Sequence, residues 1–108
     1  MPRTARRKSE TNIYHAMLRG IGKQNIFEDD LDKEKFLQIL AEAKEKRHFA
    51  LYAYCLMNKH VHLLLKTEDT PLEIIFKQIG SNYVYWYNTR YDDRGRFLVF
   101  IGLAESII

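Results

Sequence analysis

The sequence predicts one α+β domain in which an antiparallel sheet is covered on a single face by two helices. Two segments of helical length carry apolar residues at helical spacing, and between them an apolar run is broken by one tight turn. Shorter apolar segments stand near both ends. The chain has 108 residues and is 46% hydrophobic, which suits one domain with a real core.

The first strand is predicted over residues 13–19, a mixed apolar segment without a breaker, and the glycines and Asn25 that follow predict a loop. A helix is predicted from Asp29 or Asp30 to about Lys46, because Asp is a favoured N-cap residue. One apolar face recurs along this helix, formed by Phe36, Ile39, Leu40 and Ala43.

The run over 51–66 predicts a hairpin with a two-residue loop at Asn58-Lys59, where Asn would tolerate a positive φ. In this register Met57 pairs with His60 and Cys55 with His62. The bulkier face would lie under the helices: Tyr52, Tyr54, Leu56, Val61, Leu63 and Leu65. The other face carries Ala53, Cys55, Met57, His60, His62 and Leu64.

His60 and His62 would then lie side by side on the uncovered face, about 6 to 7 Å apart along the strand. Two neutral imidazoles so placed can bind one divalent cation. They can equally be two ordinary half-buried strand histidines, and the pair alone leaves both interpretations open.

A second helix is predicted to start at Thr70-Pro71, with Thr70 as cap and Pro71 at the first helical position. Its apolar stripe comprises Leu72, Ile75, Ile79, Tyr83 and Trp86. A loop near 92–95 and a last strand over 97–101 follow. The order strand, helix, strand, strand, helix, strand is the ferredoxin-like βαββαβ arrangement.

The charge balance is mildly basic, with 17 Lys and Arg against 14 Asp and Glu, which is compatible with a nucleic-acid partner. Residues 1–12 form a basic arm, which either contacts phosphate or is an ordinary terminus, and the domain is predicted over 13–108. The single cysteine, Cys55, is expected to be a buried thiol in a reducing, cytoplasmic setting. No apolar run is long enough to predict a membrane span or secretory signal.

Five collinear segments resemble the single-tyrosine HUH transposases, and in particular their REP-associated, IS200-like branch. They are 1–6 (MPRTAR), 13–20 (IYHAMLRG), 26–30 (IFEDD), 51–65 (LYAYCLMNKHVHLLL) and 83–88 (YVYWYN). The resemblance implies that His60 and His62 bind Mg²⁺ or Mn²⁺ at the scissile phosphate of single-stranded or hairpin DNA. A tyrosine would attack that phosphate and form a 5′-phosphotyrosine intermediate for strand transfer. The resemblance and the unprotected sheet edges also favour a homodimer.

The chain departs from this family where the nucleophile is expected. The catalytic tyrosine of the family lies on a further helix that has no counterpart here, and 96–108 resembles an out-of-frame tail. We therefore expect a transposase-like protein with impaired cleavage or, alternatively, a DNA-binding remnant without chemistry. A metal-binding module unrelated to DNA is a third interpretation.

Other residues are weaker candidates. The candidate substitute nucleophiles are Tyr85, Tyr87 and Tyr91, which are expected to be more exposed than Tyr83. The expected DNA contacts are Arg3, Arg6, Arg7, Lys8, Arg19, Lys77 and Arg90. His15 shares the parity of the uncovered face and lies either near the metal pair or simply packed in the sheet.

Overall fold

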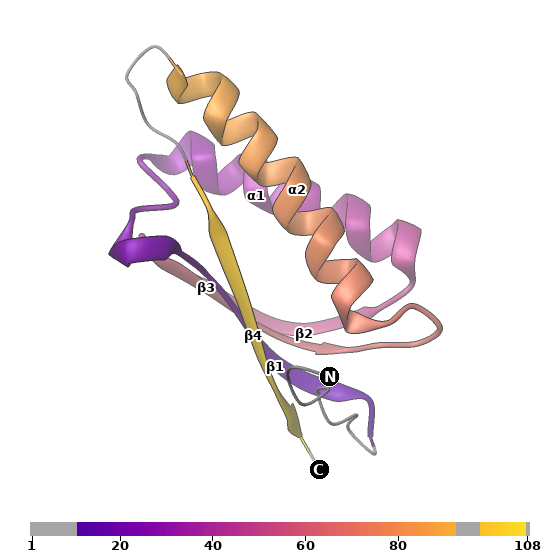
Figure 1. Cartoon of the computed structure of the whole chain (residues 1–108). Helices are drawn as coiled ribbons and strands as arrows, with labels where there is room; N and C mark the ends of the chain where they lie inside the picture. The colour runs from indigo at the N-terminus through magenta and orange to yellow at the C-terminus, as the bar shows by residue number, and fades with distance from the viewer. Residues whose placement is uncertain (1–10, 93–97, 108) are drawn as a thin grey trace, which may run out of the picture.

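The computed structural model describes residues 11–92 and 98–107. The elements are β1 (Ile13–Gly20), a 3-10 turn (Ile21–Lys23), α1 (Asp30–Arg47), β2 (Ala50–Leu56), β3 (His60–Lys66), α2 (Leu72–Tyr91) and β4 (Phe100–Ile107). The strands form one sheet in the order β2-β3-β1-β4, and every neighbouring pair is antiparallel. Both helices lie on the same side of this sheet (Figure 1). The predicted α+β class and the ferredoxin-like element order are confirmed.

The core lies between the helices and alternate residues of the two central strands. Its strand members are Tyr14, Ala16, Leu18, Val61, Leu63 and Leu65, each at most 5% exposed. The helices contribute mainly Phe36, Ile39, Leu40 and Ala43 from α1 and Leu72, Ile75, Ile79, Tyr83 and Tyr87 from α2. Because side chains alternate along a strand, the residues between the core members of β1 and β3 are left on the uncovered face.

The predicted hairpin register is confirmed, since Cys55 lies opposite His62 and the Met57 N–H donates to the His60 carbonyl at 2.9 Å. The predicted turn chemistry is wrong, because neither loop residue has a positive φ. The Asn58 carbonyl instead accepts the backbone N–H groups of Ile26 and Phe27. Contacts from a distant loop therefore hold this turn.

The prediction for β2 is wrong in two respects. Tyr52 and Tyr54 are 55% and 53% exposed rather than core residues, and Cys55 is an exposed thiol. β2 is an outer strand, and its register with β3 shifts between Leu51 and Ala53, so that Tyr52 is an extra residue. Outer position and bulge together leave much of β2 uncovered.

The helix ends differ from prediction by about one residue. Asp29 is the N-cap of α1, and its carboxylate accepts the Asp32 N–H at 3.1 Å. Pro71, with extended backbone, occupies the N-cap position of α2, whereas the Thr70 hydroxyl lies 3.5 Å from Asp69 and makes no cap. The second helix thus begins at Leu72.

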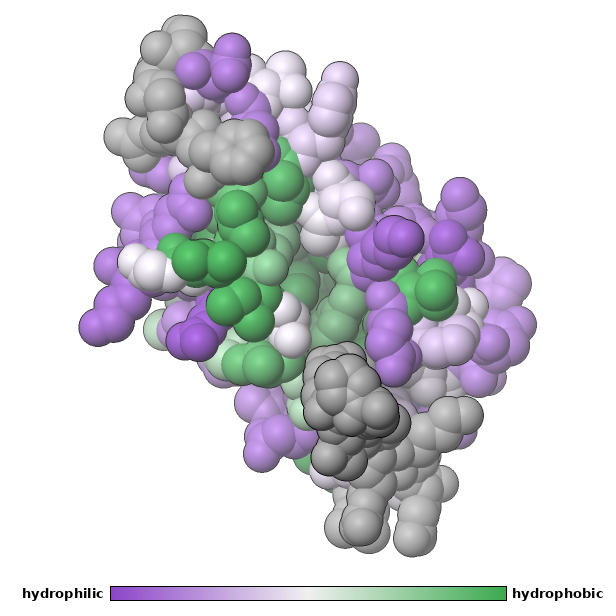
Figure 2. Space-filling model, in the orientation of Figure 1, coloured by the Kyte–Doolittle hydropathy of each residue, from purple (hydrophilic) through white to green (hydrophobic). Residues whose placement is uncertain are grey.

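β4 is longer and later than the predicted strand over 97–101. It pairs with β1 along its whole length, from Gly20 opposite Phe100 to Ile13 opposite Ile107. Most of the segment that resembled an unrelated tail is therefore part of the sheet. A groove of about 560 Å³ lies along the contact between α2 and β4, with apolar walls that include Leu18, Phe76, Val84, Leu98 and Phe100. Figure 2, in the orientation of Figure 1, shows apolar side chains gathered on this face of the molecule.

None of the helices in the described part of the chain has the length and apolar character needed to cross a membrane.

Candidate functional site

The uncovered face of the sheet, called the open face below, presents side chains from three strands. They are Ile13, His15, Met17 and Arg19 of β1, His60, His62, Leu64 and Lys66 of β3, and Ile101, Leu103, Glu105 and Ile107 of β4. Three of the chain's four histidines thus share one surface, which lies on the opposite side of the sheet from the helices (Figure 1).

His60 and His62 lie side by side on this face, as the spacing predicts. Their ring centroids are 4.9 Å apart, and the rings are nearly perpendicular at 87°. The Nδ1 atom of His60 is buried and has no hydrogen-bond partner among the described residues. A buried polar atom without a partner is costly, so it marks a place where a bound cation or water would be stabilising.

His15 and Glu105 extend the pair into a row across three strands. His15 Nε2 lies 3.0 Å from His62 Nδ1, and the two rings are stacked with centroids 5.2 Å apart. On its other side, His15 Nδ1 lies 3.3 Å from a carboxylate oxygen of Glu105. His15 is therefore a member of the histidine cluster and more than a packed sheet residue.

Glu105 is a site residue that sequence reasoning missed. It lies in the segment that resembled a tail, and its position opposite His15 follows from the register of β4 on β1. The recurrence of Ile101, Leu103 and Ile107 at odd positions, with Glu105 as the one polar residue among them, could have indicated a strand. Nothing local to the sequence specifies which residue of β1 each would face.

The electrostatics of the cluster favour a neutral His62. Burial lowers the pKa of His62 below its ordinary value, and the neighbouring His60 and His15 lower this pKa further. A neutral imidazole keeps a lone pair, which is the form that binds a cation.

The residues present fit a cation that keeps open coordination positions. Within 11–92 and 98–107, no group of three or more His, Cys, Asp and Glu side chains is arranged to hold a metal ion. Two imidazoles can still bind a divalent ion whose other positions are taken by water or phosphate. Imidazole ligands suit Mn²⁺ better than Mg²⁺, which prefers oxygen.

The expected DNA contacts are not all brought together. Arg19 is exposed on the open face, directly opposite His60 in the register. Lys77 is exposed on α2 and lines the apolar groove, away from the histidines. Four others, Arg3, Arg6, Arg7 and Lys8, lie outside the described residues. Only Arg19 among the described basic candidates shares a surface with the histidine pair.

The candidate tyrosines lie on the helix side of the sheet, across from the histidines. Tyr85 is 76% exposed, but the expectation of exposure is wrong for Tyr87 and Tyr91, at 1% and 2%. The Tyr91 hydroxyl donates to Asp32 at 2.7 Å, and that of Tyr87 donates to Glu28 at 2.8 Å. Burial raises the pKa of Tyr91, so its hydroxyl is a poor nucleophile where it stands.

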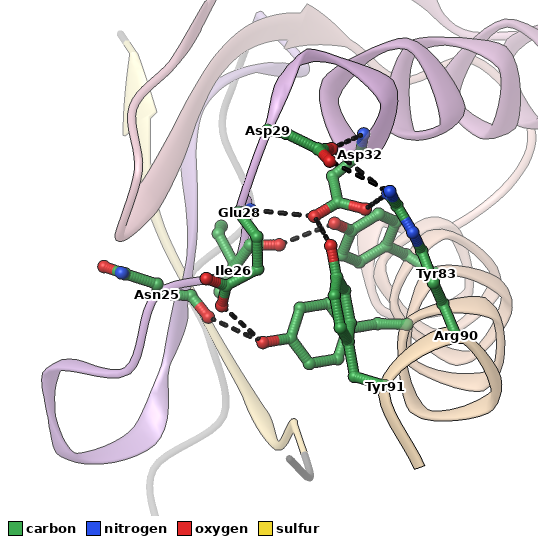
Figure 3. A network of polar contacts seen from close by, with 9 residues as sticks. Asn25, Ile26, Glu28, Asp29, Asp32, Tyr83, Arg90 and Tyr91 are labelled. Atoms are coloured by element: carbon green, nitrogen blue, oxygen red, sulfur yellow. Dashed lines mark hydrogen bonds and ion pairs between the residues drawn. The ribbon is translucent and has the colours of Figure 1, made fainter. Parts of the chain in front are cut away.

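Arg90 belongs to the same polar network, which fastens α2 to the start of α1 (Figure 3). Its guanidinium donates to Asp32 at 2.5 Å and to Asp29 at 2.9 Å, and lies 5.4 Å from the centre of the Trp86 ring. This bonding gives Arg90 a structural role, and its predicted contact with DNA stays untested.

The Asp29–Arg90 pair predicts a dependence of stability on pH. The hydrogen bond from Arg90, followed by that from the Asp32 N–H, lowers the pKa of Asp29 below 3.8. The pKa of Asp29 is lower in the folded chain than in the unfolded chain. The ion pair therefore adds to the free energy of unfolding above about pH 4, and this stabilisation is lost as the pH falls through the folded-state pKa of Asp29.

Asp29→Asn tests this, since Asn can still cap the helix. Urea unfolding between pH 7 and pH 2.5 should show the wild type losing its advantage over the variant at the acid end. A difference that stays constant with pH would contradict the assignment.

Comparisons with known proteins identify the family and the fold of the chain. Residues 8–99 match the family model described as "Transposase IS200 like". No curated protein sequence matches the chain.

Two solved structures have the same fold at low sequence identity. A candidate transposase from Deinococcus radiodurans R1 is 14% identical, with a TM-score of 0.72 over 98% of this chain and 86% of its own. A REP-associated tyrosine transposase bound to a REP hairpin is 11% identical, with a TM-score of 0.68 over 100% of this chain. The chain spans 64% of the length of that second structure. At such identities the likeness shows the fold alone.

Proposed function

Because the chain belongs to the IS200-like transposase family, we propose that it binds single-stranded DNA carrying a hairpin on the open face of its sheet. A divalent cation held by His60 and His62 would anchor a phosphate of that DNA. The observation that carries the proposal is the pair of adjacent imidazoles on the side of the sheet away from α1 and α2. Among the described residues, one buried nitrogen of this pair has no hydrogen-bond partner.

Several features of the open face support a phosphate ligand. Arg19 stands opposite His60 and can pair with a phosphate as a bidentate donor. The basic arm can add contacts that depend on charge and not on sequence. One solved structure of the same fold has a REP hairpin bound.

A bound Mg²⁺ or Mn²⁺ would neutralise charge on the phosphate and orient it. The chain's own residues supply imidazole nitrogen ligands at His60 and His62, and a positive charge at Arg19. All three side chains project from paired strands, which fixes where their backbones stand relative to one another.

Strand cleavage and transfer through a 5′-phosphotyrosine is the second candidate function, favoured by the same histidine pair. In that step a tyrosine oxygen bonds to phosphorus, the bond to the 3′ oxygen breaks, and the proton ends on the leaving 3′-OH. All seven tyrosines fall within the described residues. Tyr14 and Tyr54 share the helix-side parity of Leu63, and four others are on α2. The seventh, Tyr52, is the extra residue at the register shift of the outer strand β2, which β3 separates from the β1 histidine. We therefore place DNA binding ahead of cleavage by this chain's own tyrosines.

A homodimer remains part of the proposal. β2 and β4 are the outer strands of the sheet, and Leu103 and Ile107 of β4 are 44% and 40% exposed. Outer strands with exposed apolar residues favour pairing with a second copy.

The single cysteine offers a direct test of where DNA binds. Cys55 is exposed and lies opposite His62, so alkylation of its thiol reports on the open face. We expect a hairpin oligonucleotide with Mn²⁺ to slow this alkylation several-fold, and added salt to restore the rate because phosphate contacts weaken with salt. Alkylation at the free-protein rate while gel shift shows bound DNA would place the DNA elsewhere.

The same mixture separates binding from cleavage. On a denaturing gel we expect no covalent protein–DNA adduct. An adduct that forms with Mn²⁺ and disappears in His60→Ala would instead establish the second candidate function.

A further inference from the structure

We propose that Glu105 and His15 are positioning residues that keep the proton of His62 on Nδ1 and leave His62 Nε2 free to bind the cation. The inference rests on the proposed function for its cation and on the geometry of the row for its proton. It gives β4 a part in the site, and it concerns two residues that never touch the cation.

The first step is the bond between Glu105 and His15. The register of β4 places Glu105 directly opposite His15, and the carboxylate oxygen is 3.3 Å from His15 Nδ1. An ionised carboxylate can only accept a hydrogen bond. His15 Nδ1 must therefore carry the proton of this bond.

The second step follows from the chemistry of a neutral imidazole, which has one N–H and one acceptor nitrogen. With its proton on Nδ1, His15 can only accept at Nε2. Its partner at 3.0 Å, His62 Nδ1, must then be the donor. The lone pair of His62 is left on Nε2.

The third step is what this arrangement does for the site. In a metal-binding histidine, the N–H of the second ring nitrogen commonly donates a hydrogen bond to a carboxylate or carbonyl group. This bond fixes the tautomer and the orientation of the ring. Here the acceptor is another histidine, and the carboxylate stands one residue further away. The planes of the His15 and His62 rings are 12° from parallel, an orientation that suits an in-plane N–H···N bond between them.

A competing arrangement has both nitrogens of His15 protonated. The bond to His62 would then run the other way, and His62 would carry its proton on Nε2, where it blocks the cation. The two arrangements predict opposite tautomers for one ring, so a measurement of that tautomer decides between them.

The test uses the full chain labelled with ¹⁵N at histidine, without metal, at a pH about one unit above the ordinary histidine pKa of about 6.5. Two-bond ¹H–¹⁵N spectra report which nitrogen of His62 is protonated. We expect protonated Nδ1 in the wild type and a mixture of tautomers in Glu105→Val, which cannot accept a bond. Leu103→Ala, on the same strand and face, is the control and should keep the wild-type tautomer.

The second readout is Mn²⁺ binding by electron paramagnetic resonance. Glu105→Val should weaken Mn²⁺ binding about three- to tenfold. Losing the hydrogen-bond partner of a metal-binding residue usually costs about 10- to 100-fold in affinity, and the smaller effect is expected here because Glu105 is 82% exposed. Glu105→Gln keeps an acceptor oxygen and should recover part of the loss.

The outcomes separate the inference from the function on which it rests. A wild-type His62 protonated on Nε2, or a folded Glu105→Val with an unchanged tautomer, would overturn the positioning role. Absence of Mn²⁺ binding in every variant, with the tautomer shift intact, would overturn the cation site and leave the proton assignment standing. Glu105 is exposed on an outer strand, so the amide spectrum of Glu105→Val should remain that of a folded chain.

Discussion

Asp32→Ala is expected to destabilise the fold by about 3 to 5 kcal/mol, as is usual when one partner of a buried charge pair is removed. Asp32 is completely buried, and its carboxylate accepts from Arg90, from the Tyr91 hydroxyl at 2.7 Å and from the Glu28 N–H at 2.7 Å. The variant removes this acceptor from all three donors, and Arg90 keeps its hydrogen bonds to Asp29. Since domains of this size have a free energy of unfolding of about 5 to 15 kcal/mol, the variant would lose much of its stability.

Urea denaturation followed by far-UV circular dichroism measures this loss, with Asp30→Ala as the matched control. Asp30 stands in the same first turn of α1 and shares the favourable interaction with the helix dipole, but its side chain is exposed. The control should lose less than about 1 kcal/mol. If the two variants unfold at the same urea concentration, the network does not hold the helices together.

The features of this network that are local could be predicted, and those that join distant segments could not. The acidic residues at 29, 30 and 32 indicate a helix start from sequence alone, through capping and the helix dipole. That Asp32 would be buried depends on Tyr91 and Arg90, about sixty residues away. Arg90 follows a run of aromatic residues in the sequence, and this local context predicts a DNA contact. Its partners, Asp29 and Asp32, are known only from the fold.

The histidine site divides in the same way. His60 and His62 share a face because of the two-residue period of a strand, which is a property of three consecutive residues. Glu105 joins them only through the pairing of β4 with β1, which the sequence does not specify. The exposure of Cys55 and Tyr54 also depends on β2 being an outer strand, since an apolar segment has the same composition at the edge as at the centre.

The largest functional effect is expected from His60→Ala and His62→Ala on Mn²⁺ binding. Each removes one of two imidazole ligands, and we expect each to weaken binding by about tenfold or more, which corresponds to about 1.4 kcal/mol. The double variant should bind no more Mn²⁺ than the exposed carboxylates of the surface do. A titration followed by electron paramagnetic resonance measures all three.

The control is His48→Asn, which removes the histidine at the C-cap of α1, outside the open face. His48 has a φ of 55°, a conformation that Asn tolerates, so the fold should be kept. This set of variants also tests whether His60 and His62 are ordinary half-buried strand histidines. In that case His60→Ala and His62→Ala would lower the urea midpoint and leave Mn²⁺ binding equal to that of His48→Asn. The cation-binding interpretation predicts weaker Mn²⁺ binding in both variants than in His48→Asn. For His60→Ala it also predicts a urea midpoint that is not lowered, because the variant removes a buried Nδ1 atom that has no hydrogen-bond partner among the described residues.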